Sequence, residues 1–474
     1  MLTRLRATNF KNLRDCEVRF GPFSCIAGPN GIGKSNLFDA IRFLSLLGDH
    51  TLADAAAEIR APDSRSADPR SLFFRHGDTA ATRMTLEADV IVPSEGEDDL
   101  GQAVRASSTY LCYSIELEYK TPETGLRIIG ERLRPLSRKE AGSSLGFPAH
   151  ARWVDRHIKT VVRKPFISTE STSEGLMVLM HQDQRQGRRK RLLADRLPRT
   201  VLSTADGSEY PTALMVRREL QSWRFLQLEP AALRQPDAFS AVPRLDPSGR
   251  HLPALLASFA DNGSDGDLLA HLANRLSELV DDVRSISVDR DPKRELLTVV
   301  VEDRQGTRYT ARDLSDGTLR FLALAALEVD PKFCGTILME EPENWLYPDR
   351  VPAIIQLLEA LGSDPQAKED DEPLRQVVIN THSPLVVAGV DPEDLLVAVT
   401  ETIVTEGQAV SGVTFRALPN TWRQGLPGVP SPIPPGALVP YLLAPLDRGA
   451  GQAWLDRPEL VSQLDIPFRE RTSD

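Results

Sequence analysis

The 474-residue sequence is poor in cysteine and has no long apolar run, and these two shortages exclude several classes of protein. Its four cysteines, Cys16, Cys25, Cys112 and Cys334, lie far apart, with no C-x-x-C pair and no histidine cluster near them. This spacing argues against a zinc site and predicts free thiols in a reducing compartment. The longest apolar stretches, such as Phe321–Val329, fall short of the ~18 residues that a membrane-spanning helix needs. Because the first residues also lack the basic-then-apolar order of a signal peptide, we expect a cytoplasmic protein without a membrane partner.

Sustained heptads and an excess of positive charge are also missing. Proline and glycine recur between the two ends of the chain, so we expect no long coiled-coil arm. The formal net charge of -11 argues against a protein whose whole surface binds nucleic acid. The net charge does not exclude a local basic groove. The run Arg185–Arg191 could line such a groove or could form a solvated loop.

The periodicity of the apolar residues predicts an α/β fold. Residues up to Ile26 alternate as strands do, and a glycine-rich turn then leads into an amphipathic helix from Ser35 to about Leu47. The final third is expected to contain, in order, helix 315–329, strand 336–339, helix 349–362 and strand 376–380. Between the two ends, strand patterns cover much of 82–120, a helix is expected over 267–286 and a hairpin over 295–309. The segment 51–69 is predicted to be exposed or weakly ordered.

These patterns divide the chain into four parts. We expect residues 1–50 and 211–420 to form one α/β head, with a strand-rich and irregular insertion lobe at 51–210 and a Pro/Gly-rich C-terminal extension at 421–474.

Gly28–Ser35, with the sequence GPNGIGKS, matches the phosphate-binding pattern G-x-x-x-x-G-K-[ST] and stands between a predicted strand and a predicted helix. Gly31 and Gly33 would let the backbone curl so that its N–H groups face phosphate oxygens. Lys34 is expected to reach the β- and γ-phosphates of ATP, and the Ser35 hydroxyl to bind Mg²⁺. The alternative is a chance glycine-rich turn. We assign the ATP contacts of this segment to Asn30, Gly31, Gly33, Lys34, Ser35 and Asn36.

The apolar strand that begins near Thr336 ends in two acids, Glu340 and Glu341. Carboxylates at a strand tip face the crevice where α/β folds bind ligands. Glu340 is expected to hold Mg²⁺, through water, and Glu341 to polarise the attacking water. An acidic surface turn would give the same pattern.

Two further polar positions are less specific. Ser315 is a natural N-cap, and Gly317 would let a phosphate approach the start of the helix, although the residues alone favour an N-capped core helix. His382 follows another apolar strand, where a lone histidine is usually structural. Its order and spacing after the other motifs make it a candidate γ-phosphate sensor.

The order of the motifs is what indicates a family. A P-loop, a long insertion, L-S-D-G-T at 314–318, I-L-M-E-E-P-E-N at 337–344 and N-T-H-S at 380–383 resemble ABC-type ATPases of the RecF, SMC and OLD-like group. The chain is most similar to prokaryotic AAA-family ATPases that lack coiled coils and a Toprim domain. The resemblance covers residues 1–48 and about 210–400, and it implies an ABC-type P-loop head built from both chain ends.

The resemblance also implies roles for single residues. Ser315 and Gly317 match the signature loop, which contacts ATP bound to the opposite protomer. Glu340, Glu341 and His382 match the Walker B acid, the catalytic glutamate and the switch histidine. The sequence departs from the family in having Glu340 where Asp is commoner, and in having Asp316 where many members have Gly.

The carboxylate of Asp316 should therefore point away from phosphate, toward Arg320. No glutamine can be assigned to the Q-loop. The expected function is an ATP-driven, Mg²⁺-dependent homodimeric switch in DNA transactions such as phage defence or DNA repair. Because no Toprim-like acid set is visible, we expect a separate effector protein. The alternatives are a transporter-type ATPase subunit and an ATP-gated scaffold that does not hydrolyse ATP.

Overall fold

The structure is a computed structural model, and it describes residues 1–59, 68–77, 79–121, 125–137, 140, 145–183, 189–261, 268–280, 282–344, 346–367, 373–405 and 408–433. No helix among these residues is both long enough and apolar enough to cross a membrane.

A six-stranded sheet joins segments from both ends of the chain, in the order β14-β19-β20-β3-β21-β22. The first five of these strands run parallel, and β22 pairs antiparallel with β21. The bounds are β3 Phe23–Ala27, β14 Arg224–Leu226, β19 Gly335–Glu340, β20 Arg375–Thr381, β21 Leu395–Thr405 and β22 Gln408–Ala417. The sheet places the carboxyl ends of β3, β19 and β20 side by side, which is where α/β sheets bind ligands.

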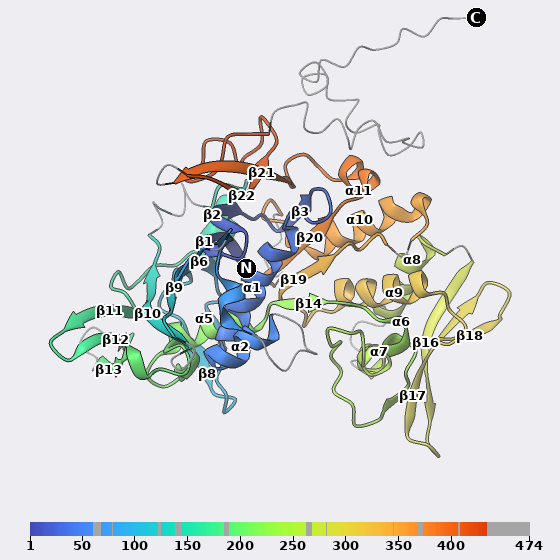
Figure 1. Cartoon of the computed structure of the whole chain (residues 1–474). Coiled ribbons are helices and arrows are strands. Elements are labelled where there is room, and N and C mark those ends of the chain that lie inside the picture. Colours follow the sequence, from blue (N-terminus) through green and yellow to red (C-terminus); the bar gives the residue numbers. More distant parts are fainter. Residues whose placement is uncertain are drawn as a thin grey trace, which may run out of the picture.

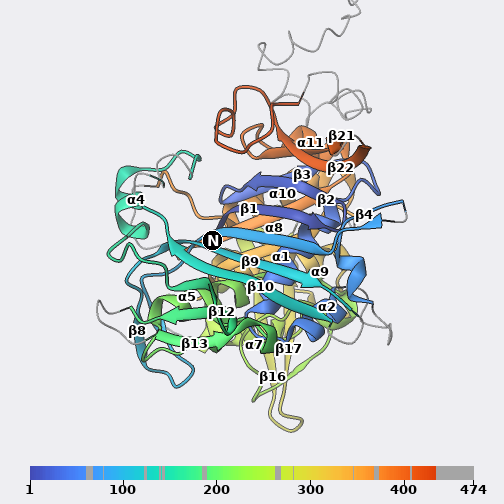
Figure 2. The same ribbon diagram turned by 60° about the vertical axis from the view of Figure 1, so that its left-hand side comes forward.

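A second sheet of eight strands is antiparallel, in the order β13-β12-β11-β10-β9-β6-β1-β2. Figure 2 shows β1, β9, β10, β12 and β13 of this sheet lying side by side. The bounds are β1 Leu2–Phe10, β2 Leu13–Arg19, β6 Arg83–Ile91, β9 Tyr110–Tyr119, β10 Leu126–Pro135, β11 Ile167–Thr172, β12 Gly175–His181 and β13 Arg189–Leu193. Because β1 pairs with β6, the first two strands of the chain continue into the sheet of the inserted residues.

Four shorter strands form a third sheet at the side of the molecule opposite the antiparallel sheet (Figure 1). They are β15 Asp237–Ala238, β16 Val283–Asp291, β17 Leu296–Asp303 and β18 Arg308–Thr310. Two small hairpins, β4 Arg75–His76 with β5 Thr79–Ala80 and β7 Glu95–Glu97 with β8 Ala103–Arg105, complete the described strands.

Helices pack on both faces of the parallel sheet, with α1 on the face toward the antiparallel sheet and α9 and α10 on the other. Neighbouring residues of β19 show this division, because Leu338 packs in one core with α1 while Ile337 and Met339 pack in the other with α9 and α10. The helices are α1 Lys34–Leu47, α2 Leu52–Glu58, α4 Ala151–His157, α5 Pro211–Gln221, α6 Pro230–Leu233, α7 Leu252–Asp261, α8 Leu268–Ser277, α9 Asp316–Val329, α10 Val351–Leu361 and α11 Pro384–Gly389. Four short 3₁₀ turns are η1 Pro69–Leu72, η2 Ala194–Arg196, η3 Leu202–Thr204 and η4 Pro348–Arg350.

A buried arginine is among the contacts that join the described part of the C-terminal extension to the strands at the start of the chain. Arg423 has no exposed surface and donates to the carbonyl of Arg19 (2.9 Å) and to Ser24 Oγ (3.1 Å). The rest of the predicted extension, from residue 434 onward, lies outside the described residues.

The predicted α/β class is confirmed, and the four elements predicted for the final third lie within two residues of their expected ends as α9, β19, α10 and β20, whereas α11, β21 and β22 were not predicted. Two expectations are wrong. The helix expected over 267–286 ends at Ser277, because β16 begins at Val283 after a turn in which Asp282 has φ 72°. Part of the segment expected to be exposed, 51–69, is α2, whose Leu52 and Ala55 are buried.

Candidate nucleotide-binding site

The P-loop lies between β3 and α1, as the sequence predicts. Gly31 and Gly33 have φ 76° and 116°, values that favour glycine. Lys34 is the first residue of α1, and its buried Nζ donates to the carbonyls of Gly28 (2.7 Å) and Pro29 (3.2 Å). Burial lowers the pKa of Lys34, and the charges of nearby glutamates oppose this shift. The loop thus presents one lysine and the start of a helix to the same space.

Asn12, in the turn between β1 and β2, braces this loop, and sequence reasoning missed it. Its Nδ2 donates to the carbonyl of Ile32 (3.0 Å), and its Oδ1 accepts from Asn36 Nδ2 (2.7 Å). A Cβ on Gly33 would lie 2.0 Å from Asn12 Nδ2, so the two residues fit only while position 33 is glycine. No motif in the sequence marks Asn12, since the contact joins elements that are distant in the chain.

Glu340 and Glu341 stand at the carboxyl end of β19. Glu340 is the last residue of the strand, is exposed, and accepts from Asn380 Nδ2 (3.1 Å). Glu341 has φ 47°, a conformation that costs a non-glycine residue about 1–2 kcal/mol. Its N–H donates to the carbonyl of Asn380 (2.9 Å), which belongs to β20. The strained turn therefore directs two successive carboxylates out of the end of the sheet.

Glu341 is held by two side chains. Asn344 Nδ2 donates to its Oε2 (2.5 Å), and His382 Nδ1 lies 2.6 Å from its Oε1, where a protonated Nδ1 donates. Burial raises the pKa of Glu341, but the hydrogen bonds from Asn344 and His382 outweigh burial and leave the pKa below its usual 4.5. Glu341 is therefore an oriented, ionised carboxylate at neutral pH. The sequence predicted Glu341 and His382 but not Asn344.

A third acid of the same segment, Glu343, points inward. It is 7% exposed and accepts a hydrogen bond from Thr381 Oγ1, which in turn accepts from the Ser383 N–H (2.9 Å). Burial raises the pKa of Glu343 above its usual 4.5. These bonds tie the segment after β19 to the segment after β20, and they fix the position of His382 relative to Glu341.

A cavity of ≈ 440 Å³ brings the predicted residues of the two strand ends together. Its lining consists of Asn30, Gly31, Gly33, Lys34, Ser35, Asn36, Glu340, Glu341, Asn344 and Asn380. Backbone N–H groups at a helix start and a lysine suit the phosphates of ATP, and hydroxyl and carboxylate oxygens suit Mg²⁺. The donor set therefore fits a Mg²⁺–nucleotide.

The signature residues lie elsewhere. Ser315 caps α9, and its Oγ accepts from the Thr318 N–H (3.2 Å), as its N-cap reading predicts. Among the described residues, those that line the cavity do not include Ser315 or Gly317. Asp316 forms an ion pair with Arg234 (2.6 Å), a partner that the sequence did not indicate, while Arg320 Nε donates to the carbonyl of Leu228 (2.8 Å).

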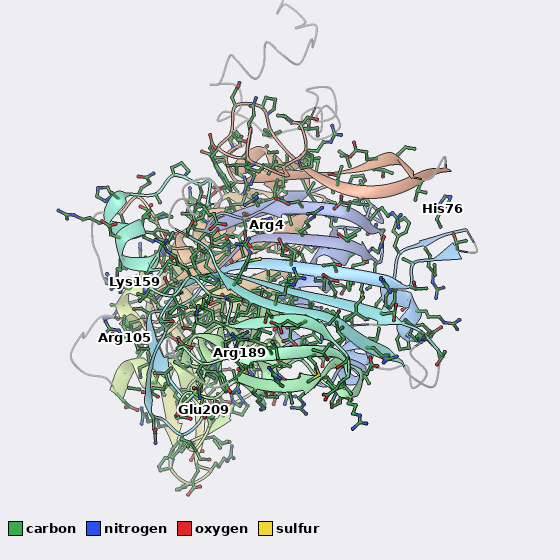
Figure 3. All side chains as sticks on the ribbon, turned by 90° about the vertical axis from the view of Figure 1, so that its left-hand side faces the viewer. Arg4, His76, Arg105, Lys159, Arg189 and Glu209 are labelled. Carbon is green, nitrogen blue, oxygen red and sulfur yellow. The ribbon has the colours of Figure 1, made fainter. Side chains whose placement is uncertain are left out.

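The basic run lies partly outside the described residues, which include only Arg189, Lys190 and Arg191. These three are exposed on β13, at the edge of the antiparallel sheet, and Figure 3 shows Arg189 there. Among the described residues, one group could offer metal ligands, Glu87, Asp89 and Cys112. Arg4 forms ion pairs with both of its carboxylates.

Comparison with known families and proteins identifies the family of the chain. A model of the family described as "AAA domain, putative AbiEii toxin, Type IV TA system" matches residues 23–388, well over half of the chain. The DNA replication and repair protein RecF of Porphyromonas gingivalis is 32% identical over 90 residues, which are 19% of this chain and 21% of that protein. RecF of Magnetococcus marinus is 47% identical over 57 residues, 12% of this chain and 15% of that protein. The chain thus matches about a fifth, or less, of the length of these relatives.

Solved structures of SMC heads have lower sequence identity to this chain than the RecF proteins have. An SMC head bound to the C-winged helix domain of ScpA has a TM-score of 0.43 at 16% identity, covering 88% of this chain and 98% of that one. The SMC head domain from Thermotoga maritima has a TM-score of 0.36 at 13% identity, covering 87% and 97%. The resemblance to RecF-type P-loop ATPases is confirmed by the family match and the RecF matches, and the chain belongs to this AAA-domain, AbiEii-type family.

Proposed function

We propose that the chain binds and hydrolyses ATP with Mg²⁺ and works as a homodimeric molecular switch. One observation carries the proposal. The carboxylate of Glu341, held by Asn344 and His382, faces a cavity whose other wall contains Lys34 and Ser35. A base fixed opposite a phosphate-binding loop is the arrangement that hydrolysis of a terminal phosphate needs.

Each residue then has a definable task. The P-loop N–H groups and Lys34 bind the β- and γ-phosphates, while Ser35 and Glu340 hold Mg²⁺. When bound, Mg²⁺ neutralises the charge that develops on the phosphates. Glu341, ionised because its hydrogen bonds outweigh its burial, orients the attacking water and accepts its proton. His382 orients Glu341, and we propose that it responds to the γ-phosphate through that contact.

Dimerisation follows from the position of the signature loop. Ser315 caps α9 and Gly317 lies in its first turn, yet among the described residues neither lines the cavity of its own protomer. A two-fold arrangement of two chains would let each signature loop complete the partner's site. ATP would then favour the paired state over the separate one, which makes the chain a switch.

The setting that we propose is DNA repair or phage defence in the cytoplasm, with the effector activity in a separate protein. The names of the matched relatives support a role in DNA transactions, and the AbiEii description of the family supports defence. Exposed Arg189, Lys190 and Arg191 on the edge strand offer a contact for a nucleic-acid backbone.

The test is ATP turnover by the purified full chain with and without Mg²⁺. Wild type should release phosphate only with Mg²⁺, and Lys34→Ala should lose ATP binding. Lys293→Ala, a matched change at an exposed turn, should leave turnover unchanged. DNA and RNA should stay uncut. Tight ATP binding without turnover would instead indicate a scaffold, and stable association with membranes would indicate a transporter-type subunit.

A further inference from the structure

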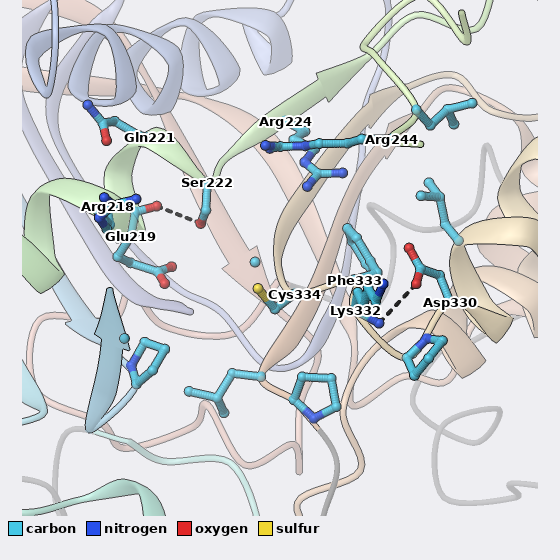
Figure 4. Close-up of a pocket in the computed structure, with 18 of the residues that line it drawn as sticks. Arg218, Glu219, Gln221, Ser222, Arg224, Arg244, Asp330, Lys332, Phe333 and Cys334 are labelled. Atoms are coloured by element: carbon cyan, nitrogen blue, oxygen red, sulfur yellow. Dashed lines mark hydrogen bonds between the residues drawn. The ribbon is translucent and has the colours of Figure 1, made fainter. Parts of the chain in front are cut away.

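A second and larger cavity, of ≈ 1210 Å³, lies at the opposite end of the parallel strands from the nucleotide site. Strand β19 connects the two sites, since it begins beside the cavity at Gly335 and ends at Glu340. The lining comes from segments that are distant in the sequence: 93–96, 156–157, 215–224, 243–245, 255–259, 327–335 and 373–374. Figure 4 shows part of this lining.

One wall of the cavity is rich in cations. Arg224, Arg244 and Lys332 line it, and Figure 4 shows the side chains of Arg224 and Arg244 next to each other. None of the three forms an ion pair with a residue of the described ranges. By contrast, Arg218 in the same lining is paired with Asp99 (3.0 Å). Asp330, in the same lining, accepts from the backbone N–H of Lys332 (2.9 Å), and its charge acts on Arg224. The wall therefore holds three cations against one carboxylate and keeps an excess of positive charge.

Arg224 is the most constrained of these cations. Its guanidinium lies over the ring of Phe333 (5.2 Å to the centroid), and its Nε is buried without a hydrogen-bond partner among the described residues. Burial, followed by the charge of Arg244, lowers the pKa of Arg224 to about 10. A buried donor without a partner is costly, and two adjacent guanidinium groups repel each other. An anion between the two guanidinium groups would remove their repulsion.

The charge and the size of the cavity indicate the kind of anion. The positive charge of three cations is larger than the single negative charge of a carboxylate can balance. A phosphate monoester carries about −1.5 to −2 charges and three acceptor oxygens, so it matches this wall better. Guanidinium groups bind phosphate through two parallel hydrogen bonds. The volume is more than a phosphate alone would fill, and Leu245, Leu255 and Phe259 add apolar surface.

We propose that this cavity binds a phosphate monoester of about mononucleotide size, with its phosphate on Arg224, Arg244 and Lys332 and its apolar or ring portion against Leu245, Leu255 and Phe259. The proposal does not depend on ATP hydrolysis at the P-loop.

Cys334 provides a reporter that needs no knowledge of the natural ligand. It lines the same cavity and is exposed, whereas the other three cysteines, Cys16, Cys25 and Cys112, are buried. A neutral reagent such as N-ethylmaleimide should therefore modify Cys334 alone in the folded protein. Intact-mass measurement then gives the rate of modification, and an occupied cavity should slow it.

The experiment uses the full chain carrying Lys34→Ala, so that nucleotides cannot act through the P-loop. AMP and phenyl phosphate are the probes, with adenosine and inorganic phosphate as controls. A probe at ten times its Kd should slow modification of Cys334 about tenfold, because about one site in ten stays open. Adenosine should not protect, and inorganic phosphate should need a much higher concentration than AMP.

Variants locate the effect. Arg244→Gln changes an exposed side chain and should weaken protection about ten- to a hundredfold in Kd, and Arg224→Gln should do the same. Arg284→Gln, at an exposed position on β16, is the matched control, and the probes should protect Cys334 in it as they do in the parent.

Protection that survives Arg244→Gln would overturn the proposal. Equal protection by adenosine and AMP, or no protection by either ester, would overturn it as well. If inorganic phosphate protects as well as the two esters do, the site holds an adventitious ion only, and the proposal is wrong. Protection by a single-stranded oligonucleotide but not by the esters would overturn it in favour of a nucleic-acid groove.

Discussion

Replacing Glu341 by glutamine removes the proposed base while keeping the shape of the side chain. Glutamine can still contact Asn344 and His382, so the change should leave the fold and ATP binding intact. A positioned base contributes about 10²–10⁴ in rate, which corresponds to about 3–5 kcal/mol of barrier. We therefore expect kcat to fall by about that factor, with the Kd for ATP nearly unchanged.

The two partners of Glu341 predict a finer effect on the pH dependence. Burial alone would raise the pKa of Glu341, and the hydrogen bonds from Asn344 and His382 hold it below 4.5. Activity that needs the carboxylate is present above this pKa and is lost as the pH falls through it. Asn344→Ala removes one of these bonds, so the acid limb of the kcat profile should move to higher pH, and kcat at neutral pH should fall about tenfold.

The assay is steady-state phosphate release under saturating ATP with Mg²⁺, over a pH series, with ATP affinity measured separately. Glu302→Gln, on β17 and paired only with Arg284 in the described residues, is the matched control and should behave as wild type. Turnover by Glu341→Gln at the wild-type rate would refute the assignment. An acid limb that does not move in Asn344→Ala would refute the role of the hydrogen bond.

Three other predictions address the loop, the signature and the interior. Gly33→Ala should weaken ATP binding and lower thermal stability more than Gly31→Ala, because a Cβ at 33 would lie 2.0 Å from Asn12 Nδ2 whereas one at 31 meets nothing within 4 Å; equal effects in calorimetry would contradict the bracing role of Asn12. Ser315→Arg should block hydrolysis without blocking ATP binding, and intact turnover would exclude a cross-protomer site. Burial raises the pKa of Glu131 from 4.5 to about 7, against hydrogen bonds from the N–H groups of Leu202 and Val201. The folded state thus keeps a proton that the unfolded state releases, so stability should fall as the pH rises from about 4.5 to about 7, and Glu131→Gln should flatten this part of the urea-unfolding profile.

The residues that the sequence revealed are those that belong to a local pattern. Lys34 and Ser35 follow a strand and open a helix, and Glu340 and Glu341 end an apolar strand, so spacing alone predicted their neighbourhood. Of the two residues that it missed, Asn12 acts through a tertiary contact, because it reaches the P-loop from a hairpin turn. Asn344 lies within the motif at 337–344, but its bond to Glu341 depends on the turn after β19, which the motif did not predict.

The errors in secondary structure have similar causes. The predicted helix over 267–286 was too long because the spacing of Val283 and Ile286 fits both a helical face and a strand. In the structure these residues form a strand, since β16 pairs with β17. The segment that holds α2 looked exposed because it is rich in alanine and aspartate, yet Leu52 and Ala55 share one buried face. The roles of the site residues and the domain limits remain predictions until they are tested.

The central claim is that ATP joins two chains into a switch, and the mass of the Glu341→Gln variant in solution tests it most directly. The variant should be a single chain of 52.4 kDa without nucleotide and about twice that mass with ATP and Mg²⁺. Adding Ser315→Arg to the variant should keep it monomeric while ATP stays bound. A mass that is the same with and without ATP, under conditions where ATP binding is measured, would contradict the account.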